Sequence, residues 1–323
     1  MPWFDLPEAE LKTYRTPTEE PEGLDAWWQT RLAESRAQAQ PPTLTPYGTD
    51  TYGPLPVWDA EFSGANGDRI KAWYLRPPTS RATDRLPTVV TYIGYGGGRG
   101  LPVEHVLLAT AGYAVFAMDT RGQGGRWSTG QTPDRADAGP EHPGVMTRGI
   151  ATPETYYYTR LMTDAALAVE AAASLDGVDP TRIAVSGGSQ GGGLALAAAA
   201  LKGDAVRVCH ADVPFLCDFQ RAITITDADP YAEISQFLAH QTTLIPAALN
   251  TLRYVDAALL ARRITATTLM SVGLMDEVCP PSTVYAAYNE IQAPKTMAVF
   301  PFSGHQAPRT HDETKLRHLH AHL

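Results

Sequence analysis

The sequence predicts an α/β fold in which helices flank a mainly parallel central sheet. After residue 86, short and continuously apolar runs alternate with helical stretches, and strands of this kind are typical of a parallel sheet covered on both faces. One of them, 183–186, passes through a glycine-rich turn into the alanine- and leucine-rich run 194–201, which has high helix propensity. The 323 residues are enough to bury a large core, and we expect a single domain over 1–323.

The first 50 residues are expected to form an extension ahead of the sheet. Within it, 24–40 is predicted to be a helix because its apolar residues share one face, and the pair of prolines that follows ends it. Two alternating segments, 57–62 and 70–75, flank the turn 64–68, and this pattern predicts a β-hairpin.

The alternation of strands and helices then continues along the chain. In order, the expected strands are 88–93, 112–118, 183–186, 206–212, 268–273 and 295–300. The expected helices are 103–111, 156–175, 194–201, 281–291 and 308–323. The loop 126–150 is longer than a compact domain usually carries without a function. The stretch 214–250 is helical but interrupted by Pro230 and Pro246, and we interpret it as a helical cap insertion.

Composition and charge argue against several functional classes. The formal net charge of −9, without a run of basic residues, argues against binding to nucleic acid or to anionic membranes. The three cysteines are odd in number and lack C-x-x-C spacing, which argues against a disulfide framework or zinc ribbon and favours buried thiols. The sequence has no signal-peptide pattern and no apolar run near the roughly 18 residues of a membrane span. We therefore expect a cytoplasmic enzyme.

Ser189 is the candidate nucleophile. It stands in the pattern Gly187-x-Ser189-x-Gly191 between a strand and a helix, where glycines let the backbone double back and the hydroxyl is exposed above the sheet. It also precedes the positive end of the helix dipole. The alternative is an ordinary serine in a glycine-rich surface turn, because a five-residue pattern also arises by chance.

A serine hydroxyl needs a base to remove its proton and an acid to orient that base. In enzymes with this kind of nucleophile turn, the acid and then the histidine follow the serine, each after a strand. Of the seven histidines after Ser189, only His305 comes just after a late strand in a glycine-containing loop. Asp276 directly follows the apolar strand 268–273 and is the preferred acid. Asp212 also ends a strand, but it precedes the cap and comes one strand too early.

The transition state of acyl transfer also needs hydrogen-bond donors for its oxyanion. One is the backbone N–H of Gln190, the residue after the nucleophile. The other is expected in the glycine-rich loop after strand 88–93, where we choose the N–H of Tyr95; a flexible turn is the alternative. Arg121 follows strand 112–118 and is expected to be a buried tie at the sheet edge rather than a substrate contact. No metal site is expected.

Several stretches between Trp3 and His305 match those of a known family. They are Tyr92-Ile93-Gly94-Tyr95, Gly97-Gly98-Arg99-Gly100, Met118-Asp119-Thr120-Arg121-Gly122-Gln123-Gly124, Tyr156-Tyr157-Tyr158, Gly187-Gly188-Ser189-Gln190-Gly191-Gly192-Gly193, Asp212-Val213-Pro214-Phe215-Leu216-Cys217, Ser271-Val272-Gly273-Leu274-Met275-Asp276 and Cys279-Pro280-Pro281-Ser282-Thr283. On these residues the chain resembles the acetyl xylan esterase / cephalosporin C deacetylase family, carbohydrate esterase family 7, which has the α/β-hydrolase fold. The Arg-Gly-Gln and Gly-x-Ser-Gln-Gly motifs together are far more specific than either alone.

The resemblance implies the same catalytic and oxyanion residues that the spacing favours, namely Ser189, Asp276 and His305 with the amides of Tyr95 and Gln190. It implies removal of acetyl groups from small acetylated xylo-oligosaccharides and from cephalosporin C, and a symmetric homo-oligomer, most simply a hexamer. The chemistry needs no metal or organic cofactor. In one position the chain departs from the family pattern: the histidine is followed by Gln306 instead of a glutamate, so a neutral amide replaces that carboxylate.

Two other functions stay open at this point. A peptidase on the same fold, such as a relative of prolyl oligopeptidase, would use the same three residues, but the sequence has no internal repeat of the kind that forms the propeller of such enzymes. The other is an inactive scaffold that binds a ligand or partner, against which the intact order of serine, aspartate and histidine argues.

Overall fold

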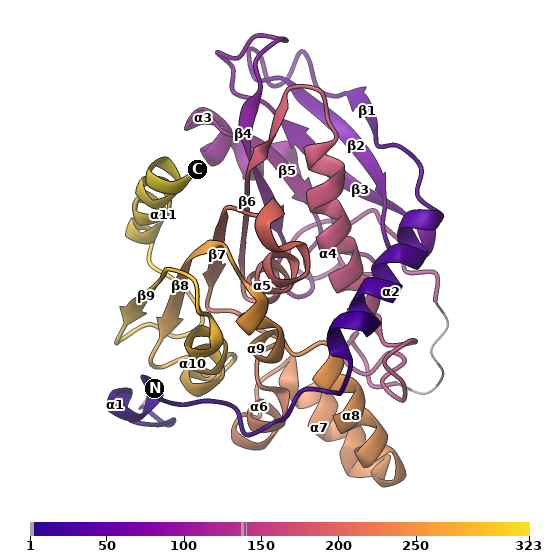
Figure 1. The fold of residues 1–323 in the computed structure, drawn as a ribbon, viewed down its shortest axis with the longest axis vertical. Coiled ribbons are helices and arrows are strands. Elements are labelled where there is room, and N and C mark those ends of the chain that lie inside the picture. Colours follow the sequence, from indigo (N-terminus) through magenta and orange to yellow (C-terminus); the bar gives the residue numbers. More distant parts are fainter. Residues whose placement is uncertain (1–2, 137–138, 140) are drawn as a thin grey trace.

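The computed structural model describes residues 3–136, 139 and 141–323, and a nine-stranded sheet lies at its centre (Figure 1). The strands lie in the order β1-β2-β3-β5-β4-β6-β7-β8-β9. Their bounds are β1 Thr43–Pro46, β2 Val57–Ser63, β3 Arg69–Leu75, β4 Leu86–Tyr92, β5 Ala114–Met118, β6 Val178–Gly188, β7 Val208–Asp212, β8 Thr267–Gly273 and β9 Lys295–Phe300. The pairs from β1 to β5 along this order are antiparallel, and the remaining pairs are parallel. The predicted α/β fold with a mainly parallel sheet is confirmed.

The central strands are continuously apolar because both of their faces are covered. Every residue of β5 and of β7 is buried. Side chains at alternate positions enter different clusters: Val90 and Val185 belong to the main core, whereas their neighbours Val89 and Ala184 pack with Leu319 on the opposite face.

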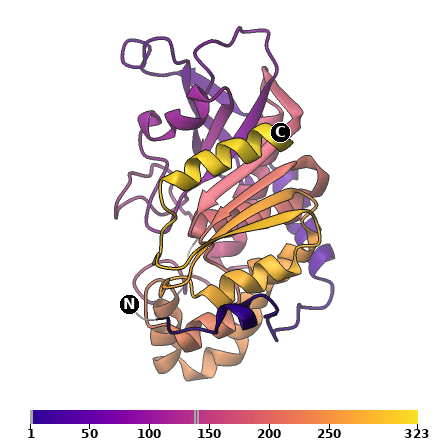
Figure 2. The same cartoon turned by 90° about the vertical axis from the view of Figure 1, so that its left-hand side faces the viewer.

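Helices from distant parts of the chain cover these faces. They include α3 (Val106–Thr110), α4 (Tyr157–Ala173), α5 (Gln190–Lys202), α10 (Pro281–Glu290) and α11 (Thr310–His322). Figure 2 shows α11 lying across the sheet on the side opposite to α10. The helices α4 and α5 contact β6 on the face of the main core, and α3 packs on β5 beside a sheet face that α11 also covers.

The chain leaves the sheet after β7 and forms the expected helical insertion. Its helices are α6 (Phe219–Ile225), α7 (Tyr231–His240), the short 3₁₀-helix η4 (Thr242–Leu244) and α8 (Ile245–Tyr254), after which α9 (Ala257–Leu260) leads back toward β8. The helices α6, α7 and α8 lie together at one end of the molecule, at the bottom of Figure 1. The sequence placed the end of this cap too early, at residue 250, within α8.

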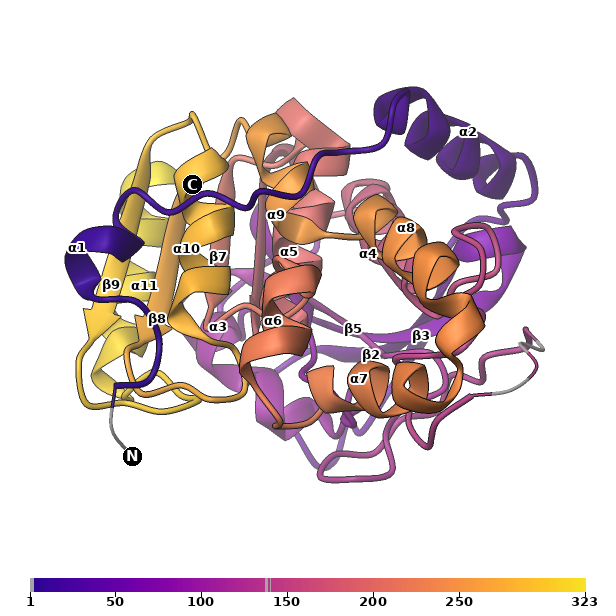
Figure 3. The ribbon, with the colours of Figure 1, turned by 90° about the horizontal axis from the view of Figure 1, so that it is seen from below.

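The N-terminal segment is more closely integrated than an extension. After α1 (Glu8–Leu11) it runs past α10 and α9 to α2 (Leu24–Ala37), as Figure 3 shows. The carboxylate of Asp5 accepts a hydrogen bond from the N–H of Ser282 at 2.7 Å and lies 2.8 Å from an Arg221 nitrogen, so it links α10 to α6. The indole of Trp28 donates to the carbonyl of Tyr254 at 2.9 Å.

Two sequence predictions in this part of the fold need correction. The first 50 residues include β1, which forms the edge of the sheet beside β2. All four residues of β1 are exposed, so the sequence has no alternation of buried and exposed positions that would have predicted this strand. The helix predicted over 103–111 is divided into the 3₁₀-helix η2 (Pro102–His105) and α3.

One stretch, Thr242–Arg263, is long and apolar enough to cross a membrane by length and composition, although the sequence alone did not indicate it. In the structure it is divided among η4, α8, α9 and the 3₁₀-helix η5 (Ala261–Arg263), and more than half of its apolar window is buried inside the protein. Core helices meet the same criterion, so the stretch is weak evidence for a membrane span.

Candidate active site

The turn around Ser189 joins β6 to α5 through a backbone geometry that only particular residues permit. Ser189 has φ 56° and ψ −121°, a conformation that is rare for a residue with a side chain and is commonly found at functional sites. A Cβ on Gly187 would lie 2.3 Å from the backbone of Gly191, and a Cβ on Gly191 would lie 2.3 Å from the carbonyl oxygen of Tyr92. Both positions therefore require glycine, and the Gly-x-Ser-x-Gly pattern follows from the shape of the turn.

His305 connects Ser189 to Asp276. Its Nε2 lies 2.8 Å from Oγ of Ser189, and its Nδ1 lies 2.8 Å from Oδ2 of Asp276. The three residues follow β6, β8 and β9, whose carboxyl ends meet at one edge of the sheet. Asp276 is fully buried, and its Oδ1 accepts the N–H groups of Val278 and Cys279 at 2.9 Å each. These bonds fix the carboxylate so that Oδ2 orients the imidazole, which can then accept the proton of Ser189.

Asp212, the alternative acid, has different partners. Its Oδ1 lies 2.9 Å from Nε2 of His311, and its Oδ2 accepts a hydrogen bond from Lys315 at 2.8 Å. Burial by itself raises the pKa of Asp212, but His311 and Lys315 outweigh burial and hold that pKa well below its usual range. Asp212 is linked to the nucleophile only through the backbone, where its carbonyl accepts the N–H of Ser189 at 2.9 Å.

The two expected oxyanion donors lie beside the nucleophile. Gln190 begins α5 directly after Ser189, and the loop that follows β4 comes close to it: a Cβ on Gly94 would be 4.0 Å from the Cβ of Ser189. Within the described part of the chain, neither the N–H of Tyr95 nor that of Gln190 donates a hydrogen bond to a protein acceptor. Both groups are therefore available to a carbonyl oxygen of a substrate.

Sequence reasoning missed two side chains that brace this loop. Trp127, in the long loop 126–150, is 62% exposed, and its indole N–H donates to the carbonyl of Tyr95 at 2.8 Å. Gln123 accepts the N–H of Gly96 at 2.7 Å through its Oε1. The Arg-Gly-Gln motif was a signal for Gln123, whereas only the length of its loop pointed to Trp127.

Arg121 is a structural residue, as the sequence led us to expect. Its guanidinium is fully buried and lies 2.5 and 2.7 Å from the two carboxylate oxygens of Asp164, a residue of α4. It also lies 3.1 Å from a carboxylate oxygen of Asp68 and 3.4 Å from one of Asp134. Arg121 therefore ties the hairpin turn, the long loop and α4 together behind the site.

A cavity of about 490 Å³ opens over the nucleophile. Its lining comes from the turn at Ser189, the loop after β4, Trp127 and the segment that leads from His305 into α11. Gln306 belongs to this lining, so the amide that replaces the glutamate of the resembled family faces the same space as the reacting groups. A cavity of about 490 Å³ is large enough for a sugar ring.

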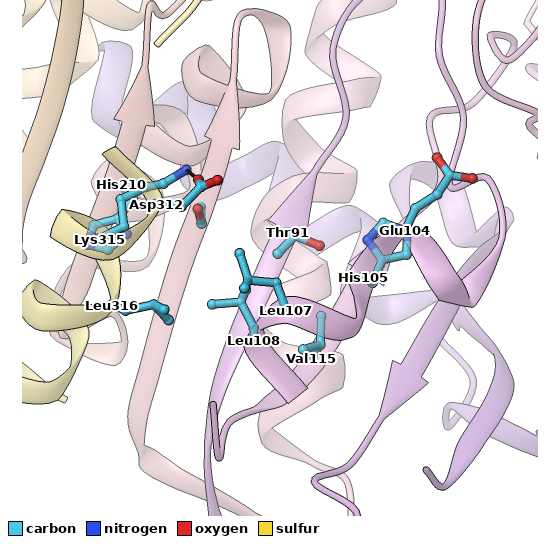
Figure 4. Close-up of a pocket in the computed structure, with 11 residues that line it drawn as sticks. Thr91, Glu104, His105, Leu107, Leu108, Val115, His210, Asp312, Lys315 and Leu316 are labelled. Carbon is cyan, nitrogen blue, oxygen red and sulfur yellow. Dashed lines mark ion pairs between the residues drawn. The ribbon is translucent and has the colours of Figure 1, made fainter. Parts of the chain in front are cut away.

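A smaller cavity of about 160 Å³ lies between α3 and α11 against the sheet (Figure 4). Leu107 and Leu108 project into it from α3, while Lys315 and Asp312 of α11 form an ion pair of 3.2 Å at its other side. Lys315 and Asp312 also line the cavity over Ser189, so one helix turn separates the two spaces.

Within the described ranges, one group of side chains has the spacing of a metal site, and it coincides with the residues above. Asp276, Cys279 and His305 offer ligand atoms within 4.8 Å of one another. Burial, together with the charge of Asp276, raises the pKa of the Cys279 thiol well above its usual value, so Cys279 stays protonated and is a poor ligand. Asp276 and His305 are already hydrogen-bonded to each other, and this geometry suits proton transfer better than metal binding.

Comparison with known proteins found a matching family model and similar solved structures. The family model described as acetyl xylan esterase (AXE1) matches residues 1–323. An acetyl xylan esterase from Paenibacillus sp. R4 has a similar structure, with a TM-score of 0.92 and 36% identity over 98% of this chain and 100% of that one. Acetyl xylan esterase 1 from Thermoanaerobacterium sp. JW/SL YS485 superposes with a TM-score of 0.88 and 32% identity over 98% of both chains.

A curated relative is longer than this chain. The acetyl esterase Axe7A of Xylanibacter ruminicola is 28% identical over 296 residues, which are 91% of this chain. The match spans 65% of the length of that relative.

Proposed function

The chain belongs to the acetyl xylan esterase family, and from this premise we propose that it is a serine esterase that removes acetyl groups from small acetylated carbohydrates. The proposed substrates are acetylated xylo-oligosaccharides and acetyl esters of the cephalosporin C type. The observation that carries the proposal is the position of His305, within 2.8 Å of both Ser189 Oγ and the buried Asp276.

The proposed reaction is a two-step acyl transfer. Ser189 Oγ attacks the acetyl carbonyl carbon while His305 Nε2 takes the hydroxyl proton, giving a tetrahedral intermediate. The intermediate collapses, the C–O bond to the sugar breaks, and His305 gives its proton to the departing alcohol. Water then attacks the acetyl–Ser189 ester with His305 again acting as base, and acetate leaves as Ser189 recovers its proton. Asp276 keeps Nδ1 protonated throughout, and the steps require no metal or organic cofactor.

The developing negative charge on the carbonyl oxygen needs stabilisation in both steps. We assign this role to the backbone N–H groups of Tyr95 and Gln190, because neither has a protein acceptor in the described chain and both flank Ser189. Trp127 and Gln306 line the cavity over Ser189, where the alcohol portion of the substrate would lie. An indole face is a suitable surface for the apolar face of a sugar ring.

The proposal extends to assembly and location. We infer a homo-oligomer, a hexamer by family resemblance, and a cytoplasmic enzyme with neither nucleic acid nor a membrane as partner. Exposed apolar side chains on and near the edge strand and α3 are suitable interface material, namely Leu44, Tyr47, Leu101, Val103 and Leu107.

The test is covalent labelling combined with turnover. A fluorophosphonate should label the parent protein at Ser189, and Ser189→Ala should lose labelling and about 10⁴–10⁶-fold in kcat with the fold intact. Ser174→Ala, at the end of α4, is the control and should behave as the parent does. Labelling at another residue, or activity of Ser189→Ala within tenfold of the parent, would overturn the assignment.

The rival peptidase activity is tested with matched leaving groups. We expect turnover of an aryl acetate and of acetylated xylo-oligosaccharides, with peptide anilides left intact. Faster cleavage of a peptide anilide than of the aryl acetate would favour the peptidase. A protein that labels with fluorophosphonate but releases no acetate from any acetylated sugar would contradict the proposed substrate class.

A further inference from the structure

A carboxylate from the cap lies against the loop that carries Tyr95. Glu233, in the first turn of α7, is 3% exposed, and its Oε1 accepts a hydrogen bond from the Tyr95 hydroxyl at 2.6 Å. The second carboxylate oxygen accepts the N–H of Met146 at 3.1 Å, and the Tyr95 hydroxyl itself accepts the N–H of Val145 at 2.9 Å. Three segments that are distant in the sequence therefore meet at this one contact: the cap, the loop 126–150 and the loop after β4.

The contact lies beside a cavity of about 410 Å³ that is lined by Tyr95, Gly144, Val145 and Glu233. A Cβ on Gly144 would lie 2.1 Å from Oε2 of Glu233, and the φ of Gly144 is 119°, a conformation that favours glycine. The ring of Tyr95 packs edge-on against Phe215, with centroids 6.4 Å apart, and Phe215 packs in turn against Tyr231 of α7 at 4.4 Å. The Tyr95 side chain is thus held by the cap through both an apolar contact and a charged hydrogen bond.

Protonation states favour a stable bond. Burial and the neighbouring Glu233 raise the pKa of the Tyr95 hydroxyl far above its usual value, so Tyr95 remains the donor. Burial also raises the pKa of Glu233, although the bonds from Tyr95 and Met146 act in the opposite direction. The phenol proton therefore points at the carboxylate, and the hydroxyl cannot move away from the cap without breaking this bond.

The other side of the same residue is fixed as well. The carbonyl of Tyr95 accepts the indole N–H of Trp127 at 2.8 Å, and the next amide, that of Gly96, donates to Gln123 at 2.7 Å. With the ring, the carbonyl and the following amide all restrained, the remaining polar group of this residue, its own N–H, keeps one direction.

We propose that Glu233 is a positioning residue for the esterase reaction: it holds Tyr95 so that its backbone N–H meets the oxyanion. The cap is then part of the catalytic apparatus in addition to covering the site. This inference rests on the proposed function, in which the Tyr95 amide is an oxyanion donor. Donors placed in advance contribute most to transition-state stabilisation, and small displacements are costly.

The experiment compares Glu233→Gln and Glu233→Ala with Gln236→Ala, a control at an exposed position of the same helix. Gln keeps an acceptor for the Tyr95 hydroxyl but turns an NH₂ group toward the Met146 N–H, so we expect about a 3–10-fold fall in kcat. Ala removes both acceptors, and we expect about a 10–100-fold fall. KM for a small aryl acetate should stay within about twofold, because the displaced donor acts on the transition state and not on ground-state binding. Gln236→Ala should match the parent.

A second variant separates positioning from loss of fold. Tyr95→Phe removes the hydroxyl without leaving a large void, and the double variant Tyr95→Phe/Glu233→Ala should be no slower than the worse single variant, because both changes break one contact. Effects that multiply, a rise in KM with unchanged kcat, or a Glu233→Ala protein with parental kcat would overturn the proposal. Fluorophosphonate labelling of the parent protein at Ser189 tests the proposed function separately. It reports whether Ser189 is activated, whatever the role of Glu233.

Discussion

Gln123 and Gln190 hydrogen-bond to each other through their side chains, with Nε2 of Gln123 donating to Oε1 of Gln190 at 2.8 Å. Gln123 belongs to the Arg-Gly-Gln motif after β5, and Gln190 follows the nucleophile. Each is also bonded to the loop after β4, Gln123 to the N–H of Gly96 at 2.7 Å and Gln190 to the carbonyl of Ile93 at 3.1 Å. The two motifs occur together because their glutamines brace the same loop, the one that carries Tyr95.

The first prediction concerns this brace. Gln123→Glu replaces the donor to Gln190 by a carboxylate oxygen, so two acceptors face each other next to the oxyanion loop. We expect kcat to fall by about 10–100-fold with little change in KM, because the Tyr95 amide loses a support that acts in the transition state. Steady-state kinetics with an aryl acetate measures this, and Gln292→Ala, an exposed glutamine outside the site, is the control. A parental kcat in Gln123→Glu would contradict the role of the brace.

The second prediction separates the two aspartates. Asp276→Asn should reduce kcat by about 10²–10⁴-fold, less than Ser189→Ala does. The variant keeps His305 as the base, but the imidazole loses the carboxylate that fixes its orientation and tautomer. Asp212→Asn should keep most of the activity and lose stability instead, since Asp212 is paired with His311 and Lys315. If Asp212→Asn were inactive and Asp276→Asn active, with both proteins folded, we would have chosen the wrong acid.

The stability effect of Asp212 carries a pH signature. Its folded-state pKa is held below the value of about 3.9 that an unfolded chain would have. Its contribution is therefore fully present above that value and is lost as the pH falls from there toward the folded-state pKa. The difference in melting temperature between the parent and Asp212→Asn should be constant near neutral pH and shrink below about pH 4. A difference that grows on acidification would contradict this.

The sequence predicted residues whose role depends on their place in the chain, and it missed those whose role depends on contacts between loops. Ser189, Asp276 and His305 could be chosen because each follows a strand in a known order, and parallel strands bring such positions to one edge. The contact of Glu233 with Tyr95 joins residues 138 positions apart through side-chain orientations that no periodicity encodes. β1 was missed for a related reason: its four exposed residues show no alternation between buried and exposed faces.

The third prediction tests Arg121 as a structural residue. Arg121→Met should lower the free energy of unfolding by about 3–5 kcal/mol, because it leaves the buried carboxylate of Asp164 without its partner. Enzyme that remains folded at low temperature should keep a KM within about twofold of the parent, since Arg121 touches no part of the cavity over Ser189. Denaturant unfolding and kinetics measure the two effects. A large rise in KM without loss of stability would make Arg121 a substrate contact.

The fourth prediction concerns assembly. We expect light scattering at micromolar concentration to give a mass six times the 34.9 kDa of one chain. Charged residues in place of exposed apolar ones should weaken the assembly, and Leu107→Glu, on an exposed face of α3, is a suitable probe. A monomer of the parent protein at this concentration would contradict the proposed oligomer.

The last prediction concerns the size of the acyl group. On the side of the cap Tyr95 packs against Phe215, which also contacts Phe219 and Tyr231. The cavity over Ser189 is lined by other residues, among them Trp127 and the segment after His305. Acetyl and propionyl groups should therefore react well, whereas longer acyl chains must displace packed side chains at about 1–3 kcal/mol. The alcohol side should be permissive, because the leaving group points toward the open cavity and contributes little differential binding.

The measurement of acyl preference is kcat/KM for acetyl, butyryl and octanoyl esters of one phenol, which holds the leaving group constant. Acetate release from acetylated xylo-oligosaccharides and from intact acetylated xylan tests the other side of the site. We expect kcat/KM to fall from acetyl to octanoyl by about 10-fold or more, the equivalent of 1–3 kcal/mol of overpacking, and the short oligosaccharides to react faster than the polymer. Rates that rise with acyl length, or polymer cleaved as fast as oligosaccharide, would contradict an esterase for small acetylated carbohydrates, because both results require a wider site than the packed rings of the cap allow.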